Sequence, residues 1–119
     1  MKKIYHLANC GTCQRIIKEI GAGDDFEFQN IKTEKMTAEQ LEEMKNLAGS
    51  YESLFSRRAM KYKAWGLKEK TLTEEDYKNY ILEEYTFLKR PVILVGDKIF
   101  VGNAKKVVAA AKEFISVNG

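Results

Sequence analysis

The sequence contains few of the residues that usually build disulfide frameworks or metal centres. Its 119 residues include one proline, one tryptophan, one histidine and two cysteines, and the cysteines are only three residues apart. A secreted disulfide scaffold needs more cysteines, and they are more widely spread. A closed zinc site needs four ligands, and only His6 is available besides the two cysteines. These absences argue against both classes of protein, and we expect no metal.

Long hydrophobic stretches are also absent. No apolar run approaches about 18 residues, so the sequence predicts no transmembrane helix and no membrane partner. The first residues, Met1 to Lys3, are not followed by the apolar region and cleavage site of a signal peptide, and a cytoplasmic location is therefore expected. Without repeats or interdomain linkers, residues 1–119 are expected to form a single domain with its own core.

The charges of the chain nearly balance. With 20 basic and 17 acidic residues, the formal net charge is only +3. That excess is too small to predict direct nucleic-acid binding. It is compatible with a small anionic substrate.

The first third of the sequence alternates between strand and helix patterns. Residues 3–7 are rich in β-branched and aromatic side chains, which predicts a short strand. A helix is predicted next, because apolar residues then recur at helical spacing, at Cys13, Ile16, Ile17 and Ile20. Gly21 ends this helix. A second strand is predicted where Phe26, Phe28 and Ile31 are separated by polar residues.

The middle of the sequence is predicted to be helical. Thr37 and Gln40 have the spacing of a capping box, and Thr73 begins a further helix. That further helix is expected to carry four residues on one side, Tyr77, Tyr80, Ile81 and Tyr85. Between these two helices, a short helix is predicted at about 56–65. Together they form a helical insertion of about 37–88.

The last third of the sequence predicts a hairpin followed by a helix. Residues 92–95 are predicted to form a buried strand, and Gly96 and Asp97 are typical of a two-residue hairpin loop. Residues 99–101 are predicted to form the second strand of this hairpin. The predicted order is therefore βαβ, helical insertion, ββα. This order indicates the α/β class and a thioredoxin-like fold.

The feature most indicative of chemistry is the run Cys10-Gly11-Thr12-Cys13, at the junction of a strand and a helix. The thiolate is the reactive form of cysteine, and a helix N-terminus lowers the pKa of a thiol through its partial positive charge. Cys10 at the helix start is the predicted nucleophile. Cys13, one turn further on the apolar side, is the predicted resolving thiol. The alternative is a pair of cysteines that only pack.

Six further residues are candidates for the same site. Pro91 directly precedes a strand, where it is either a cis proline or an ordinary trans proline, and the fold favours cis. Arg58 and Arg90 are candidate anion-binding residues, because guanidinium groups match oxyanion geometry. The alternative for each is a solvated surface arginine. His6, Gly11 and Thr12 are candidates for tuning the pKa of the thiol. The alternative for His6 is packing at the end of the strand.

Together these residues resemble the ArsC/Spx family, which comprises the glutaredoxin-type arsenate reductases and their relatives. The likeness covers nearly the whole chain. Residues 10–12 and their spacing from His6 are similar to the active-site loop of the arsenate reductases. Residues 54–58, followed by Tyr62, resemble the segment that supplies one substrate arginine, and 89–93 resemble the Arg-Pro strand.

The resemblance implies roles for Arg58 and Arg90 as substrate arginines and for Pro91 as a cis proline. It also shows departures. Arsenate reductases of this type have a third arginine near the final turn, where this chain has Gly102 and Asn103. They also have an arginine where Gln14 stands, and a small polar residue is usual at Arg57. Their best-known members lack a cysteine at the position of Cys13, which makes the CxxC run Spx-like.

Two functions follow from the resemblance. The first is a thiol-dependent oxidoreductase similar to arsenate reductase, acting on a small anionic or disulfide substrate. It would have no bound cofactor and would use glutathione with glutaredoxin, or thioredoxin, as external reductant. The alternative is an Spx-like regulator that binds the RNA polymerase α subunit, with a Cys10–Cys13 disulfide as its switch. A fold without appreciable turnover is a third interpretation.

Overall fold

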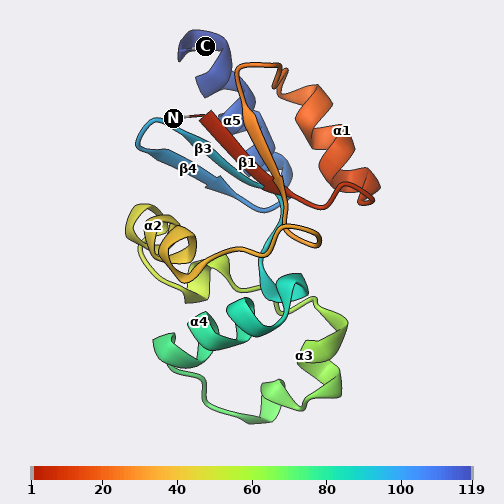
Figure 1. Ribbon diagram of the computed structural model, residues 1–119, viewed down its shortest axis with the longest axis vertical. Helices are drawn as coiled ribbons and strands as arrows, with labels where there is room; N and C mark the ends of the chain where they lie inside the picture. The colour runs from red at the N-terminus through yellow and green to blue at the C-terminus, as the bar shows by residue number, and fades with distance from the viewer. Residues whose placement is uncertain (1, 119) are drawn as a thin grey trace. The chain divides into compact units, whose positions relative to one another are not determined.

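The structure is a computed structural model that describes residues 2–118. Its helices and strands follow the predicted order, and the α/β fold with a βαβ unit, helices and a ββα unit is confirmed (Figure 1). The elements are β1 (Lys2–His6), α1 (Gly11–Glu19), β2 (Glu27–Asn30), α2 (Ala38–Ala48), α3 (Met60–Ala64), α4 (Glu74–Glu83), β3 (Val92–Val95), β4 (Lys98–Val101) and α5 (Lys105–Asn118). Short 3-10 turns occur at η1 (Glu52–Leu54), η2 (Leu67–Glu69) and η3 (Tyr85–Phe87).

Two compact units can be distinguished, and each is described by itself. The first contains the residues up to Glu34 together with those from Arg90 onward, and the second contains Lys35–Lys89. All four strands belong to the first unit, and the second is built from helices and 3-10 turns. Within residues 2–118, none of the helices combines the length and apolar character that crossing a membrane requires.

The first unit is built around a four-stranded sheet with the order β2-β1-β3-β4. β1 and β2 are parallel, as expected of strands joined by the crossover helix α1, whereas β3 is antiparallel to both of its neighbours. Val95 and Lys98 are paired across the predicted two-residue hairpin loop. Gly96 in this loop has φ of 62°, a conformation that favours glycine.

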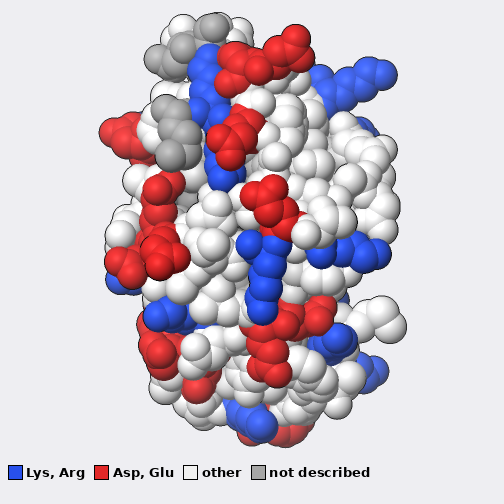
Figure 2. Space-filling model, in the orientation of Figure 1, with Lys and Arg blue, Asp and Glu red and all other residues white. Residues whose placement is uncertain are grey.

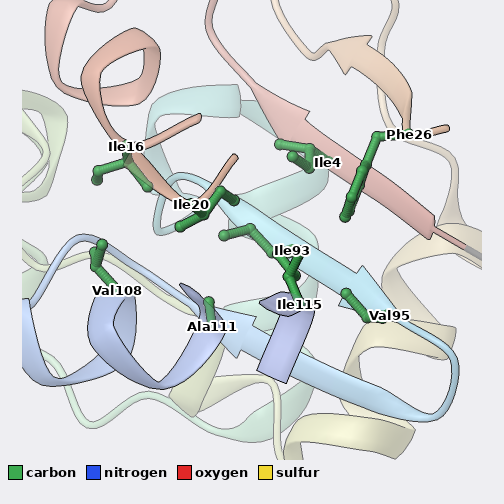
Figure 3. Packing of buried hydrophobic residues seen from close by; sticks show 9 residues of the cluster. All are labelled: Ile4, Ile16, Ile20, Phe26, Ile93, Val95, Val108, Ala111 and Ile115. Atoms are coloured by element: carbon green, nitrogen blue, oxygen red, sulfur yellow. The ribbon is translucent and has the colours of Figure 1, made fainter. Parts of the chain in front are cut away.

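The core of the first unit lies between one face of the sheet and the helices α1 and α5 (Figure 3). Apolar residues three and four apart lie on the same side of a helix, and this periodicity brings both helices onto the sheet. The buried cluster consists of Ile4, Ile16, Ile20, Phe26, Ile93, Val95, Val108, Ala111 and Ile115. The predicted inward face of α1 is thereby confirmed at two of its positions, and a third, Cys13, is also buried.

The second strand is present, but its buried side chain differs from the prediction. Phe28 is 40% exposed, whereas its neighbour Gln29 is 1% exposed. β2 is an edge strand, so one side of it has no neighbouring strand, and Phe28 is only partly covered. Gln29 is tolerated inside because its side-chain Nε2 donates a 3.1 Å hydrogen bond to the carbonyl of Glu34.

In the second unit, both predicted helix starts are confirmed as capping boxes. The Thr37 hydroxyl accepts from the backbone N–H of Gln40 at 3.1 Å, and the Gln40 side chain accepts from the N–H of Thr37 at 3.0 Å. Thr73 and Asp76 make the same reciprocal pair at 3.2 and 2.9 Å. Each box satisfies two N–H groups that a helix start leaves without partners.

Two helix boundaries differ from the prediction. The helix predicted at 56–65 is limited to α3, because the N–H of Ser56 donates at 2.6 Å to the carbonyl of Phe87 instead of entering a helix. Tyr85 lies in η3 and not in α4. α4 ends where Glu84 takes an extended conformation.

The interior of the second unit is aromatic. Phe55 stacks on Phe87 with ring centroids 5.0 Å apart, and Tyr77 lies 4.9 Å from Phe55. The same chain segments also pair through the backbone, since the N–H of Lys89 donates to the carbonyl of Leu54 at 2.9 Å. Residues 54–56 and 87–89 are therefore joined by both ring packing and backbone hydrogen bonds.

The packing of α1 predicts a large effect of shortening Ile16, which is fully buried. We expect Ile16→Ala to lower the free energy of unfolding by about 2–5 kcal/mol, because the lost contacts leave a cavity. Val117→Ala is the control, since Val117 is 77% exposed and should change stability by less than about 0.5 kcal/mol. Urea unfolding followed by circular dichroism measures both, and equal effects would contradict the described core.

Candidate functional site

Cys10 lies at the point where the chain passes from β1 into α1. It is the N-cap residue of α1, with an extended backbone at φ −95° and ψ 112°. Its N–H donates to the carbonyl of Leu7 at 3.1 Å, and its carbonyl accepts from the N–H of Gln14 at 3.1 Å. The Gln14 side chain also donates to the carbonyl of Ala8. These bonds close the loop and direct the free N–H groups of the first helical turn toward Cys10.

The surroundings of Cys10 lower its thiol pKa from the ordinary value of 9.0. Partial burial is the largest single influence and opposes ionisation, but the favourable contributions together outweigh it. They come from the backbone and side chain of Cys13, the backbone N–H of Thr12 and the positive charge of Arg90. The first turn of α1 carries no acidic residue that would counteract them.

The thiol pKa of Cys13 is shifted in the opposite direction. Cys13 is 1% exposed, and burial raises the pKa of its thiol to about 11. The backbone of Leu7 opposes this rise, while the neighbouring Cys10 sulfur adds to it. Both cysteines are free thiols. At neutral pH, the pair therefore combines a more acidic, partly exposed thiol with a protonated, buried one.

The Arg90–Pro91 segment is part of the same unit, and the peptide bond between the two residues is cis, as predicted. The Pro91 carbonyl accepts a 2.9 Å hydrogen bond from the N–H of Gly102, which joins the start of β3 to the turn after β4. Arg90 is partly buried, and its charge acts on both thiols. The structure thus brings together Cys10, Cys13 and Arg90.

The other predicted residues of the loop differ in their surroundings. Gly11 and Thr12 are exposed, and a Cβ added to Gly11 would meet open space, so the approach to the loop is open on that side. The His6 ring contacts the edge of Phe28 with centroids 5.7 Å apart. Burial lowers the pKa of His6, with its own neighbour Leu7 opposing this. A tuning role for His6 stays a prediction.

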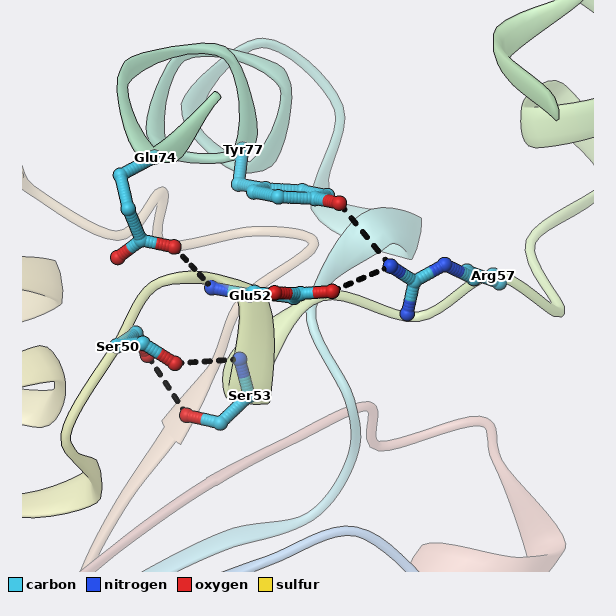
Figure 4. A network of polar contacts seen from close by, with 6 residues as sticks. All are labelled: Ser50, Glu52, Ser53, Arg57, Glu74 and Tyr77. Atoms are coloured by element: carbon cyan, nitrogen blue, oxygen red, sulfur yellow. Dashed lines mark hydrogen bonds and ion pairs between the residues drawn. The ribbon is translucent and has the colours of Figure 1, made fainter. Parts of the chain in front are cut away.

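Arg58 belongs to the second unit, where its side chain is exposed. Its neighbour Arg57 is also exposed, and it takes part in a polar network (Figure 4). Arg57 Nη2 lies 2.8 Å from a carboxylate oxygen of Glu52 and 3.0 Å from the hydroxyl of Tyr77. Sequence reasoning missed this network because Tyr77 is twenty residues away and no spacing rule connects the three.

Charge alone does not mark the site. Acidic and basic side chains are interspersed over the face shown in Figure 2. Among residues 2–118, no three histidine, cysteine, aspartate or glutamate side chains gather in a way that could hold a metal ion. The local arrangement of two thiols and one guanidinium is therefore what distinguishes this part of the molecule.

Comparison with known proteins shows a match to one protein family and to several solved structures. The sequence profile of the ArsC family matches residues 5–111. A Bacteroides fragilis protein described as ArsC-family related has a TM-score of 0.76 at 23% identity, covering 92% of this chain and 96% of that one. The protein SACOL0876 of Staphylococcus aureus has a TM-score of 0.72 at 26% identity, covering 92% and 97%.

A third structural relative is an arsenate reductase from Vibrio cholerae, with a TM-score of 0.75 at 15% identity and coverage of 92% of this chain and 96% of that one. At that identity the likeness concerns the fold. None of the curated proteins is a significant match in sequence. The thioredoxin-like fold is thus supported independently of the element order.

The charge of Arg90 predicts a measurable effect on the thiol. We expect Arg90→Gln to raise the pKa of Cys10, because the neutral amide no longer favours the thiolate, and so to slow alkylation by iodoacetamide at pH 7. The measurement is the pH dependence of that rate. Lys98→Gln removes the same charge at the opposite end of the β3–β4 hairpin and should leave the pKa nearly unchanged. Equal pKa values in wild type and Arg90→Gln would contradict the described site.

Proposed function

The chain belongs to the ArsC family, and we propose that it is a thiol-dependent oxidoreductase of the arsenate-reductase type in which Cys10 is the nucleophile. The observation that carries this proposal is the placement of two free thiols within one helical turn, with Cys10 partly exposed at the N-cap of α1 and Cys13 buried. Their pKa values shift in opposite directions accordingly. A lowered pKa increases the fraction of Cys10 that is thiolate at neutral pH, and partial exposure lets an oxidised substrate reach it.

The first step is attack of the Cys10 thiolate on arsenate. The sulfur forms a bond to As(V), and one oxygen leaves as water after taking up protons. Arg90 is the residue proposed to hold the negative oxygens, since its charge already acts on the Cys10 sulfur. Arg58 is proposed as the second anion-binding residue on the strength of the resemblance, and Pro91 as the residue that shapes the loop.

The second step needs another thiol, for which Cys13 is proposed. Its attack on the Cys10 sulfur forms the Cys10–Cys13 disulfide, breaks the sulfur–arsenic bond and leaves two electrons on arsenic, which departs as As(III). The Cys10 thiolate contributes to the high pKa of Cys13. Once Cys10 is bonded to the substrate, the contribution of its thiolate is lost, while burial, the largest cause of the high Cys13 pKa, remains.

The cycle is completed from outside the chain. There is no third cysteine, so an internal thiol relay beyond Cys13 is impossible. Glutathione with glutaredoxin, or thioredoxin, is proposed to reduce the disulfide. With glutathione, the external thiol can also take the place of Cys13 and attack the Cys10 sulfur directly.

The test combines thiol titration with turnover. In an assay coupled to NADPH oxidation through glutathione reductase, glutaredoxin and glutathione, we expect arsenate-dependent turnover that Cys10→Ser abolishes. Cys13→Ser should keep the low Cys10 pKa and become more dependent on the glutathione concentration, because the internal resolving thiol is gone. Alkylation of the same samples between pH 5 and 10 gives the thiol pKa in parallel.

Three outcomes would contradict parts of the proposal. A Cys10 pKa at its ordinary value would overturn it as a whole. A lowered pKa without arsenate turnover would exclude arsenate as substrate, and disulfides such as oxidised glutathione would be tried next. Redox-dependent capture of the RNA polymerase α subunit, with no turnover on either substrate, would favour the Spx-like regulator.

A further inference from the structure

The two free thiols at the start of α1 are placed so that both can bond to one atom. Cys10 is the N-cap residue and Cys13 lies in the first turn, three residues further on, so the two side chains are neighbours. Beside burial, which is the largest influence on both thiols, a hydrogen bond between the two side chains lowers the pKa of Cys10 and raises that of Cys13. The two sulfurs therefore lie close together.

The ligand set around this pair suits an element that needs only two protein sulfurs. Among residues 2–118, no cluster of three histidine, cysteine, aspartate or glutamate side chains could hold a metal ion, whereas a closed zinc site needs four ligands. Trivalent arsenic forms strong, nearly covalent bonds to sulfur, and it is complete with three bonds in a pyramid. Two of these bonds can come from Cys10 and Cys13, and the third can come from a ligand outside the chain.

The burial of Cys13 favours a ligand that leaves no charge on its sulfur. Cys13 is 1% exposed, and an ionised group at such a position is costly. When arsenous acid reacts with two thiols, two arsenic–oxygen bonds break and two arsenic–sulfur bonds form, and each hydroxyl leaves as water with one thiol proton. Arsenic stays trivalent, no electrons are transferred, and the product is neutral. The buried sulfur thus ends in a bond that needs no solvated charge.

The loop leaves room for the third bond of arsenic. Cys10 is partly exposed, Gly11 and Thr12 are exposed, and a Cβ added to Gly11 would meet nothing within 4 Å. Arsenic can therefore reach the Cys10 sulfur from solvent, and Cys13 then replaces a second hydroxyl from the buried side. The remaining hydroxyl, or an organic group in its place, points toward the open side of the loop.

We propose that reduced Cys10 and Cys13 form a binding site for trivalent arsenic, in which one arsenic atom bridges both sulfurs. The ligand class is arsenous acid and its mono-substituted organic derivatives. The binding itself needs only the two thiols. Its role in regulation rests on the proposed function, because trivalent arsenic is the product of the proposed reaction and its return to the reduced pair inhibits the next cycle.

The experiment titrates the reduced full chain with phenylarsine oxide and with arsenite. We expect the wild type to bind one arsenic per chain, seen as a single mass increase in native mass spectrometry, and to lose both of its reactive thiols. Cys10→Ser and Cys13→Ser keep one thiol each and should bind at least about 100-fold more weakly, because a second attachment within the same molecule multiplies the affinity. The oxidised chain, with a Cys10–Cys13 disulfide, should bind none.

Competing thiols separate a bridged arsenic from one held by a single sulfur. Glutathione has one thiol and should remove phenylarsine oxide from Cys13→Ser at a concentration that leaves the wild type loaded. Dithiothreitol forms a two-sulfur complex of its own and should unload both. Cys13→Ala serves if Cys13→Ser does not fold, since a methyl group is tolerated in a buried position where an unpaired hydroxyl is costly. Val117→Ala, at an exposed position of α5, is the control and should bind as the wild type does.

The outcomes distinguish this inference from the proposed function. Equal affinity of the wild type and Cys13→Ser, two arsenicals per chain, or no binding by the reduced wild type would each overturn the two-sulfur site, whether or not arsenate is turned over. Binding of one bridged arsenic without arsenate turnover would support the site, while arsenate reduction and the regulatory role would both fail.

The regulatory role has its own measurement. If arsenate is turned over, added arsenite should inhibit the wild type at least about 100-fold more strongly than Cys13→Ser, in proportion to the two affinities. The coupling enzymes alone, supplied with oxidised glutathione, are the control for inhibition outside the chain. Equal inhibition of the wild type and Cys13→Ser would overturn the regulatory role.

Discussion

The packing of α1 against the sheet determines the character of both thiols. Ile16 and Ile20 join the buried cluster, and Cys13 is on the same buried side of the helix. The helix is thereby fixed with its N-terminus at the end of β1, where Cys10 is the N-cap. A single periodic stripe in the sequence therefore buries one cysteine and leaves the other beside free backbone N–H groups.

Burial and local charge then act against each other at the two sulfurs. Burial is the largest influence on both thiols and disfavours both thiolates, and the charge of Arg90 favours both. The outcome differs because Cys10 is less buried and gains from the N–H groups of the first turn, whereas Cys13 also experiences the Cys10 sulfur. The charge of Arg90 therefore favours both thiolates, yet Cys10 stays the more acidic thiol and Cys13, three residues further on, stays protonated at neutral pH.

Much of this could be predicted from the sequence because it depends on local patterns. The strand–helix junction at Cys10, the capping box at Thr37, the helix start at Thr73 and the hairpin at Gly96 are each specified within a few residues, and all are confirmed. The burial of Gln29 in place of Phe28 was not predictable from alternation, because it depends on the edge position of β2 and on a distant carbonyl. The network around Arg57 was missed for the same reason, as its partners come from two other elements.

The resolving role proposed for Cys13 depends on a pKa that changes during the reaction. In the free chain, a thiol with a pKa of about 11 is almost entirely protonated at neutral pH and does not compete with Cys10 for the substrate. When the Cys10 sulfur becomes part of a covalent bond, it loses its negative charge and no longer opposes ionisation of Cys13. Burial, the largest cause of the high pKa, still disfavours the Cys13 thiolate, while the backbone of Leu7 and the charge of Arg90 continue to favour it. The difference between the two thiols thus favours Cys10 as the first to attack.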